Sequence, residues 1–180
     1  MAVSLNTGNG IEVTAAADGS LYRNMFGEGF HVLETGNQFK IEIVSNTAIK
    51  ILDGDAIMEG RHIWTKPDDS TILNIEAGEQ GKKRTDNIFL KYTNNGGVEK
   101  VEFEVVKGNS IPSSDGYNHN TSWRNESILK GGKEYKALLY SVDINGLNIE
   151  NYTKFFVPLQ SLYELDKRLQ EVERKLNSIS

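Results

Sequence analysis

A narrow apolar repeat near the C-terminal end constrains this chain more than any other feature. Apolar residues recur alternately three and four positions apart at Leu162, Leu165, Leu169, Val172, Leu176 and Ile179. Charged residues fill most of the other positions, which is typical of the a/d seam of a coiled coil. Ser161 and Glu164 form a capping box at its start. We therefore expect a helix over residues 161–180 that buries its seam against copies of itself or a partner.

The residues within the seam favour association of three or more helices. Leucine fills the a positions, whereas Leu165, Val172 and Ile179 occupy d, a distribution that shifts preference from dimers toward trimers or tetramers. In a parallel coil Arg168 at g can face Glu173 at e of a neighbour. Alternatively, the helix packs on its own domain, although such helices usually show a wider apolar stripe. About three heptads are marginal alone, so we expect help from the β domain or from more coil.

The residues before Pro158 predict a mainly β domain. Apolar and polar residues alternate over 88–92, 101–105 and 138–144. Turns at 94–97 and at Asn145-Gly146 predict hairpins, the second of type I′. Trp64 lies in another alternating run, which favours a place in the core. We expect a β-sandwich over residues 1–157, followed by a coiled-coil neck helix over 158–180.

Short accessory helices and one long loop complete the expected domain. Asp18 resembles an N-cap for a helix over 18–26 that ends at Gly27. Trp123, Ile128 and Leu129 before Gly131 suggest a second short helix with a glycine stop. Residues 108–121 are polar and rich in Ser, Asn and Gly, so we expect an exposed loop there.

Charge and hydropathy narrow the classes of partner. The net charge of −5 argues against a nucleic-acid binder, which would usually carry a basic face. No apolar run approaches the eighteen or so residues that span a bilayer, so we expect no membrane insertion. Residues 1–6 lack the basic and apolar regions of a secretory signal peptide. The chain has no cysteine, which excludes disulfides and thiolate metal sites.

No pattern of residues predicts catalysis, a metal site or a cofactor. Residues 81–86, Gly-Lys-Lys-Arg-Thr-Asp, lack the Ser or Thr and the earlier Gly of a phosphate-binding loop, so a solvated turn is expected. His31, His62 and His119 are scattered without a second ligand at helical or hairpin spacing. Tyr117 and Trp123 flank the polar loop and could contact a sugar. We expect a non-enzymatic protein.

The ordered series of segments resembles a family of tail and baseplate proteins from phages and prophages of Gram-positive bacteria. The matching segments are residues 18–27, 32–37, 54–61, 75–78, 81–86, 88–92, 101–108, 138–142 and 146–148. The resemblance covers essentially the whole β domain.

The resemblance implies a shoulder-like β-sandwich, a homotrimer, and a coiled-coil neck leading to a receptor-binding head. It also implies assembly in the host cytoplasm with other tail or baseplate proteins, and a place in the virion tail. This chain ends inside the expected neck, so no receptor-binding residue can be assigned by resemblance. The alternative is a carbohydrate-binding module that recognises host cell-wall glycan through Tyr117 and Trp123.

Overall fold

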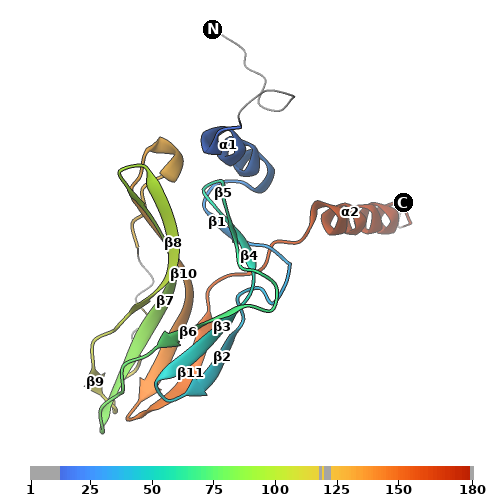
Figure 1. Ribbon diagram of the computed structural model, residues 1–180. Coiled ribbons are helices and arrows are strands. Elements are labelled where there is room, and N and C mark those ends of the chain that lie inside the picture. Colours follow the sequence, from blue (N-terminus) through green and yellow to red (C-terminus); the bar gives the residue numbers. More distant parts are fainter. Residues whose placement is uncertain (1–12, 118, 120–122, 179–180) are drawn as a thin grey trace.

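A computed structural model describes residues 13–117, 119 and 123–178, and within them the chain is mainly β (Figure 1). The elements in chain order are α1 (Ala15–Phe26), β1 (Phe30–Val32), β2 (Ile41–Ser45), β3 (Ala48–Leu52), β4 (Asp55–Met58), β5 (Arg61–Trp64), β6 (Ser70–Asn74), β7 (Lys82–Asn95), β8 (Val98–Val106), β9 (Ile111–Pro112), the 3₁₀ turn η1 (Ile128–Lys130), β10 (Glu134–Asn145), β11 (Asn148–Lys154) and α2 (Leu162–Asn177).

The strands form three antiparallel sheets. The largest has the order β11-β10-β7-β8, with β9 also paired to β7. The two smaller sheets have the orders β1-β4-β5 and β2-β3-β6. Figure 1 shows both smaller sheets beside the large one, and their apolar side chains join it in one buried cluster. A mainly β domain, as the sequence predicts, is confirmed.

The long strand β7 carries the clearest confirmed pattern. Ile88, Leu90 and Tyr92 are all buried, as their alternation predicts. On β10 the pattern holds only in part, because the register with β7 shifts between Leu138 and Tyr140. The shift places Leu139 fully in the core, whereas Leu138 is half-buried. A bulge therefore moves the apolar face by one residue, which periodicity alone does not reveal.

Both predicted hairpins are present, but one has a different turn. Between β7 and β8, Gly96 and Gly97 both have positive φ, as a type I′ turn requires. Between β10 and β11 the two central residues are Gly146 and Leu147, since Asn145 pairs with Asn148. Positive φ occurs there at Gly146 alone, which fits type II′, so the predicted type I′ turn is wrong.

The short helices begin and end near the predicted positions. Helix α1 starts a turn earlier than expected, because the side chain of Thr14, and not that of Asp18, accepts a hydrogen bond from Ala17 N at 3.2 Å. It ends before Gly27, as predicted. Neither α1 nor α2, the α-helices of the described residues, has the length and apolarity of a membrane-crossing helix.

Two other segments differ from expectation in detail. The glycine stop at Gly131 is confirmed, although the helix before it is a single 3₁₀ turn that does not include Trp123. The segment 108–121 is not wholly a loop, because Ile111 and Pro112 pair with the start of β7 as β9.

Candidate functional site

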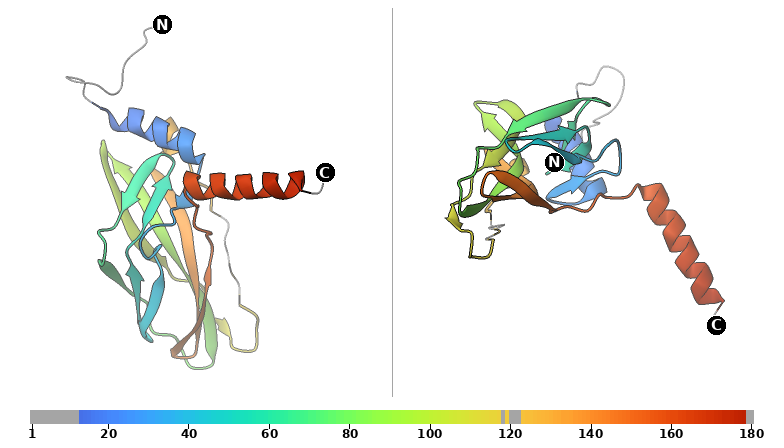
Figure 2. Two further views of the ribbon diagram at one scale, coloured as in Figure 1. Left: turned by 90° about the vertical axis from the view of Figure 1, so that its right-hand side faces the viewer. Right: turned by 90° about the horizontal axis from the view of Figure 1, so that it is seen from below.

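Helix α2 is the most exposed element of the fold. Its N-cap is confirmed, since the Ser161 hydroxyl accepts a hydrogen bond from Glu164 N at 3.2 Å. None of the residues of α2 is buried, and both views in Figure 2 show the helix projecting from the β domain. The alternative in which this helix packs on its own domain is therefore wrong.

The apolar seam of α2 lies open to solvent. The exposed fractions are 61% for Leu162, 41% for Leu165, 57% for Leu169, 53% for Val172 and 60% for Leu176. Ile179, the last seam residue, lies outside the described residues. Soluble proteins rarely expose a continuous apolar stripe, and such a stripe usually marks an interaction site.

The segment that leads into α2 is held firmly on the β domain. Leu159 N donates to Val32 O at 2.7 Å, and Glu34 N donates to Leu159 O at 3.1 Å. Just before it, the ring of Phe156 packs edge-on against Tyr140, with 5.6 Å between the ring centres. The β domain therefore fixes the chain to within a few residues of the start of the helix.

Charged side chains flank the seam. Glu171 and Lys175, one turn apart on the helix, form an ion pair with Oε1 and Nζ 2.7 Å apart. The Arg168 guanidinium donates to the Gln160 side-chain oxygen at 2.6 Å. Glu173 is exposed. Arg168 and Glu173 are the residues expected to pair between neighbouring helices. Both thus lie on a helix that projects from the β domain.

The two aromatic residues expected to contact sugar both have internal partners. The indole of Trp123 packs edge-on against Phe89, with 4.3 Å between the ring centres. The Tyr117 hydroxyl donates to Glu150, and the Lys83 ammonium lies 5.0 Å above its ring. Partial burial and the hydrogen bond to Glu150 raise the pKa of the Tyr117 phenol. A role for Tyr117 and Trp123 in glycan binding stays a prediction.

The stretch 81–86 is a turn only at Gly81, since Lys82 begins β7 and residues 84–86 are buried in that strand. Arg84 and Asp86 are 2% and 1% exposed and form an ion pair, with Nε and Oδ1 2.9 Å apart. The guanidinium also donates to the carbonyls of Glu76 and Ala77, and Gly108 N donates to Asp86 Oδ1 at 3.0 Å. The pair therefore fastens two loops to β7, and the Arg84 donors are engaged within the fold.

A polar row lies on the other face of the same strands. Thr85 Oγ1 donates to Asp143 Oδ1 at 2.7 Å, and Ser141 Oγ donates to Asn87 Oδ1 at 2.5 Å. His119 Nε2 is 3.7 Å from Asp143 Oδ2. The carboxylate lies between the hydroxyl and the imidazole, whereas activation of a nucleophile needs the imidazole in the middle. This order of groups does not suit catalysis.

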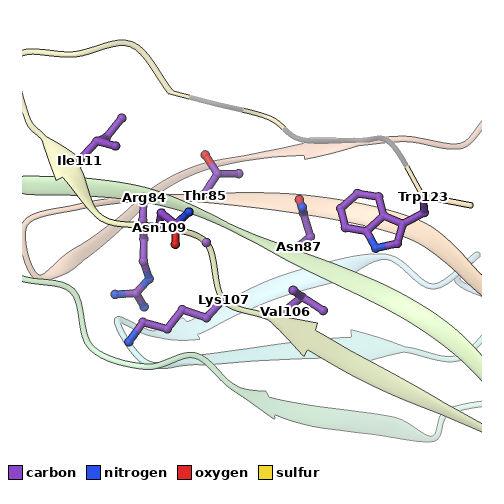
Figure 3. Close-up of a pocket in the computed structure, with 9 residues that line it drawn as sticks. Arg84, Thr85, Asn87, Val106, Lys107, Asn109, Ile111 and Trp123 are labelled. Carbon is purple, nitrogen blue, oxygen red and sulfur yellow. The ribbon is translucent and has the colours of Figure 1, made fainter.

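A small pocket opens above the polar row, and Figure 3 shows Thr85 and Asn87 below it with Ile111 and Trp123 along its rim. Its volume of about 230 Å³ is below the usual range for ligand sites. Sequence spacing could not have revealed this cluster, because Thr85 and Asp143 meet only through the pairing of β7 with β10.

The remaining candidates do not gather into a metal centre. His62 pairs with Asp55, with Nε2 and Oδ1 3.0 Å apart, and His31 Nε2 donates to Glu28 O at 2.9 Å. Over the ranges 13–117, 119 and 123–178, no group of three metal-ligating side chains occurs.

Trp64 contradicts its predicted place in the core, because it is 59% exposed. The run from Arg61 to Trp64 alternates as expected, but Ile63 is on the half-buried face and Trp64 is on the open one. An exposed indole beside a groove is a feature that periodicity did not indicate.

Comparison with models of protein families and with curated protein sequences finds no match to this chain.

Proposed function

We propose that this chain is a non-enzymatic structural component of a phage, or phage-tail-like, baseplate or tail-fibre apparatus. In this proposal a shoulder-like β-sandwich attaches to the tail tip, and α2 forms a parallel three-stranded neck that carries receptor-binding parts. The observation that carries the proposal is the apolar seam of α2, exposed along a helix that projects from the domain.

The seam supports three copies of the same helix as the occupant. Leu162, Leu169 and Leu176 would form the a layers, with Leu165 and Val172 between them, a distribution that disfavours a dimer. In parallel register Arg168 of one copy would lie opposite Glu173 of the next. The charged positions and the apolar positions thus both favour association with two further copies of this chain.

In the proposed assembly, contacts between β domains add to those between the helices. Sixteen residues span about 24 Å, which is short for an independent coiled coil. Because Leu159 is hydrogen-bonded to the β domain, three associated helices would hold three β domains close together. Contacts between domains could then supplement those of the helices.

The assignment to a tail or baseplate rests on the resemblance of the ordered β segments to that family. A trimeric shoulder with a neck is the arrangement that the resemblance implies, and the exposed seam supports it. The expected partners are other tail or baseplate proteins, with the virion tail as the location. Recognition of a cell-wall saccharide is the alternative function.

The first test is absolute mass by light scattering at micromolar concentration. The full chain should have three times the mass of one chain, and a version ending at Gln160 should be monomeric, since it lacks α2 but keeps the Leu159 hydrogen bonds. A monomeric full chain would contradict the assembly. If both versions are trimers, the β domain and not α2 is responsible for trimer formation.

The second test addresses the particle. Antibodies against the β domain should label tail tips in electron micrographs of particles from the strain that encodes the chain. Labelling that is absent from every tail particle would contradict the virion assignment, whatever the oligomeric state.

A further inference from the structure

A groove of about 510 Å³ lies where the terminal strands of all three sheets meet. Strand β5 ends one small sheet, β6 ends the other, and β8 ends the large sheet. All three strands line the groove, and Figure 1 shows β5 and β8 facing each other in the upper part of the molecule. Its volume falls within the usual range for binding sites.

The walls of this groove are strand edges. Residues 62–65, at and just beyond β5, and residues 101–103 of β8 all line it. Successive side chains of a strand point to opposite faces of a sheet, so one face cannot present consecutive residues. A groove that touches every residue in turn must run along the backbone edge of both strands.

These edges have unpaired main-chain groups among the described residues. Strand β5 pairs only with β4, and β8 pairs only with β7. Natural edge strands are usually protected by proline, by a bulge or by inward-pointing charge. Residues 101–106, Val-Glu-Phe-Glu-Val-Val, contain no proline, and their register with β7 has no shift. Val101 and Phe103 pack toward the core, so no charge points inward from them, and Glu102 is the charged side chain at this part of the edge.

The floor of the groove is the hydrophobic core itself. Phe39 and Leu90, which are 0% and 2% exposed, line it together with Leu73 of β6. The ring of Phe103 stands edge-on to Phe39, with 6.0 Å between the ring centres. Apolar side chains that enter from above would meet a packed, preformed surface.

An ion pair closes one end of the groove. Arg61 at the start of β5 donates through Nε and Nη2 to both carboxylate oxygens of Glu99 near the start of β8, at 2.8 and 2.7 Å. Long side chains, and not main-chain hydrogen bonds, join the two strands at this end. The edges are therefore held facing each other with space between them.

We propose that this groove binds an extended segment of a partner protein that has apolar residues at alternate positions. The segment adds as a strand to the free edges of β8 and β5, and its inward side chains rest on Leu73, Leu90 and Phe39. Trp64, at the rim, covers the segment as an aromatic anchor. This site is separate from α2, so it does not depend on trimer formation.

The mainly apolar floor and the unpaired main-chain edges favour a peptide over a saccharide. Ring hydroxyl groups would find few polar partners over Phe39, Leu73 and Leu90. An added strand, by contrast, would pair its main-chain donors and acceptors with those of the groove walls.

The test uses the isotope-labelled full chain and a synthetic octapeptide in which Val alternates with Thr between terminal lysines. The matched control replaces two central Thr residues with Pro, which keeps the apolar face but removes main-chain donors. The first peptide should shift the NMR signal of the Trp64 indole N–H until the shift saturates. It should also slow the exchange of the amide hydrogens of residues 101–103 at least tenfold. The control peptide should bind at least tenfold more weakly, and the Trp123 indole signal should stay in place.

Trp64→Ala should weaken the affinity for the octapeptide about tenfold. Ile72→Ala is the matched control, since Ile72 is 61% exposed on the neighbouring β6 but does not line the groove, and it should leave affinity unchanged. The proposal is overturned if neither peptide binds at millimolar concentration or if both bind equally. It is also overturned if maltotriose or chitotriose, and not the peptide, shifts the Trp64 signal.

Discussion

At the scale of single residues, the least expected feature is the buried charge at the start of β7. Arg84, Thr85 and Asp86 form a polar run that would suit a solvated turn, yet all three are buried. Such burial is tolerated because Arg84 pairs with Asp86, and partners outside this run complete the hydrogen bonds of all three residues. Those partners, at residues 76–77, 108 and 143, are brought together only by the complete fold.

Asp86→Asn should lower the free energy of unfolding by about 3 kcal/mol, because it leaves the Arg84 charge buried without a counter-ion. Urea denaturation monitored by circular dichroism measures this change. The control is Glu76→Gln, which breaks the exposed pair of Glu76 with Lys107 and should cost much less, because solvent screens that pair. Equal effects of the two substitutions would contradict the structural role of the buried pair.

The Arg61–Glu99 pair should make stability depend on pH. The hydrogen bond from Arg61 lowers the pKa of Glu99. Because the folded-state pKa lies below the unfolded value of about 4.3, the stabilisation is present above that value and is lost as pH falls through the folded pKa. Glu99→Gln should therefore reduce the free energy of unfolding at pH 7, by no more than about 1 kcal/mol, and have a smaller effect at pH 3.

The control for this pH dependence is the same substitution in an Arg61→Gln background. Without the guanidinium, Glu99→Gln should change stability little at either pH. Denaturant titrations of the four proteins at both values complete the cycle. A Glu99 effect of the same size at pH 3 and pH 7 would show that the carboxylate charge is not the cause.

At the scale of elements, the sequence predicted best what short-range pattern determines. The seam and cap of α2, and the hairpin around Gly96 and Gly97, depend on residues a few positions apart, and each is present. The start of α1 was missed because Thr14 and Asp18 are both competent caps, one turn apart. The bulge beside Leu139 was missed because no local residue marks it.

Leu169→Asp should dissociate the proposed trimer, because each copy would place a charge in the same a layer of the seam. Light scattering at micromolar concentration should give the mass of a single chain. Tyr163→Asp is the matched control, since Tyr163 is 66% exposed on α2 but lies outside the seam. The proposal fails at this point if both variants stay trimeric, or if both dissociate.

At the scale of the whole molecule, the arrangement of the three sheets decides which features could be predicted. The seam is readable from the sequence because one helix carries all of it. The groove beside Trp64 is not, since its walls come from β5 and β8 and its floor includes Phe39 and Leu90. Periodicity correctly indicates that residues 61–64 alternate between two faces of β5, but the order of strands determines that the face of Trp64 is open.

The β domain should fold without α2, because the helix contributes no residue to the core. At concentrations where the Leu169→Asp variant is monomeric, a version ending at Gln160 should have a free energy of unfolding within about 0.5 kcal/mol of that variant's. A version ending at Val157 also loses the two main-chain hydrogen bonds of Leu159, and should be less stable by about 1–2 kcal/mol. If the version ending at Gln160 does not fold, α2 is part of the domain. If the two truncated versions are equally stable, the pairing of Leu159 with the β domain does not stabilise it, and the neck would begin immediately after Val157.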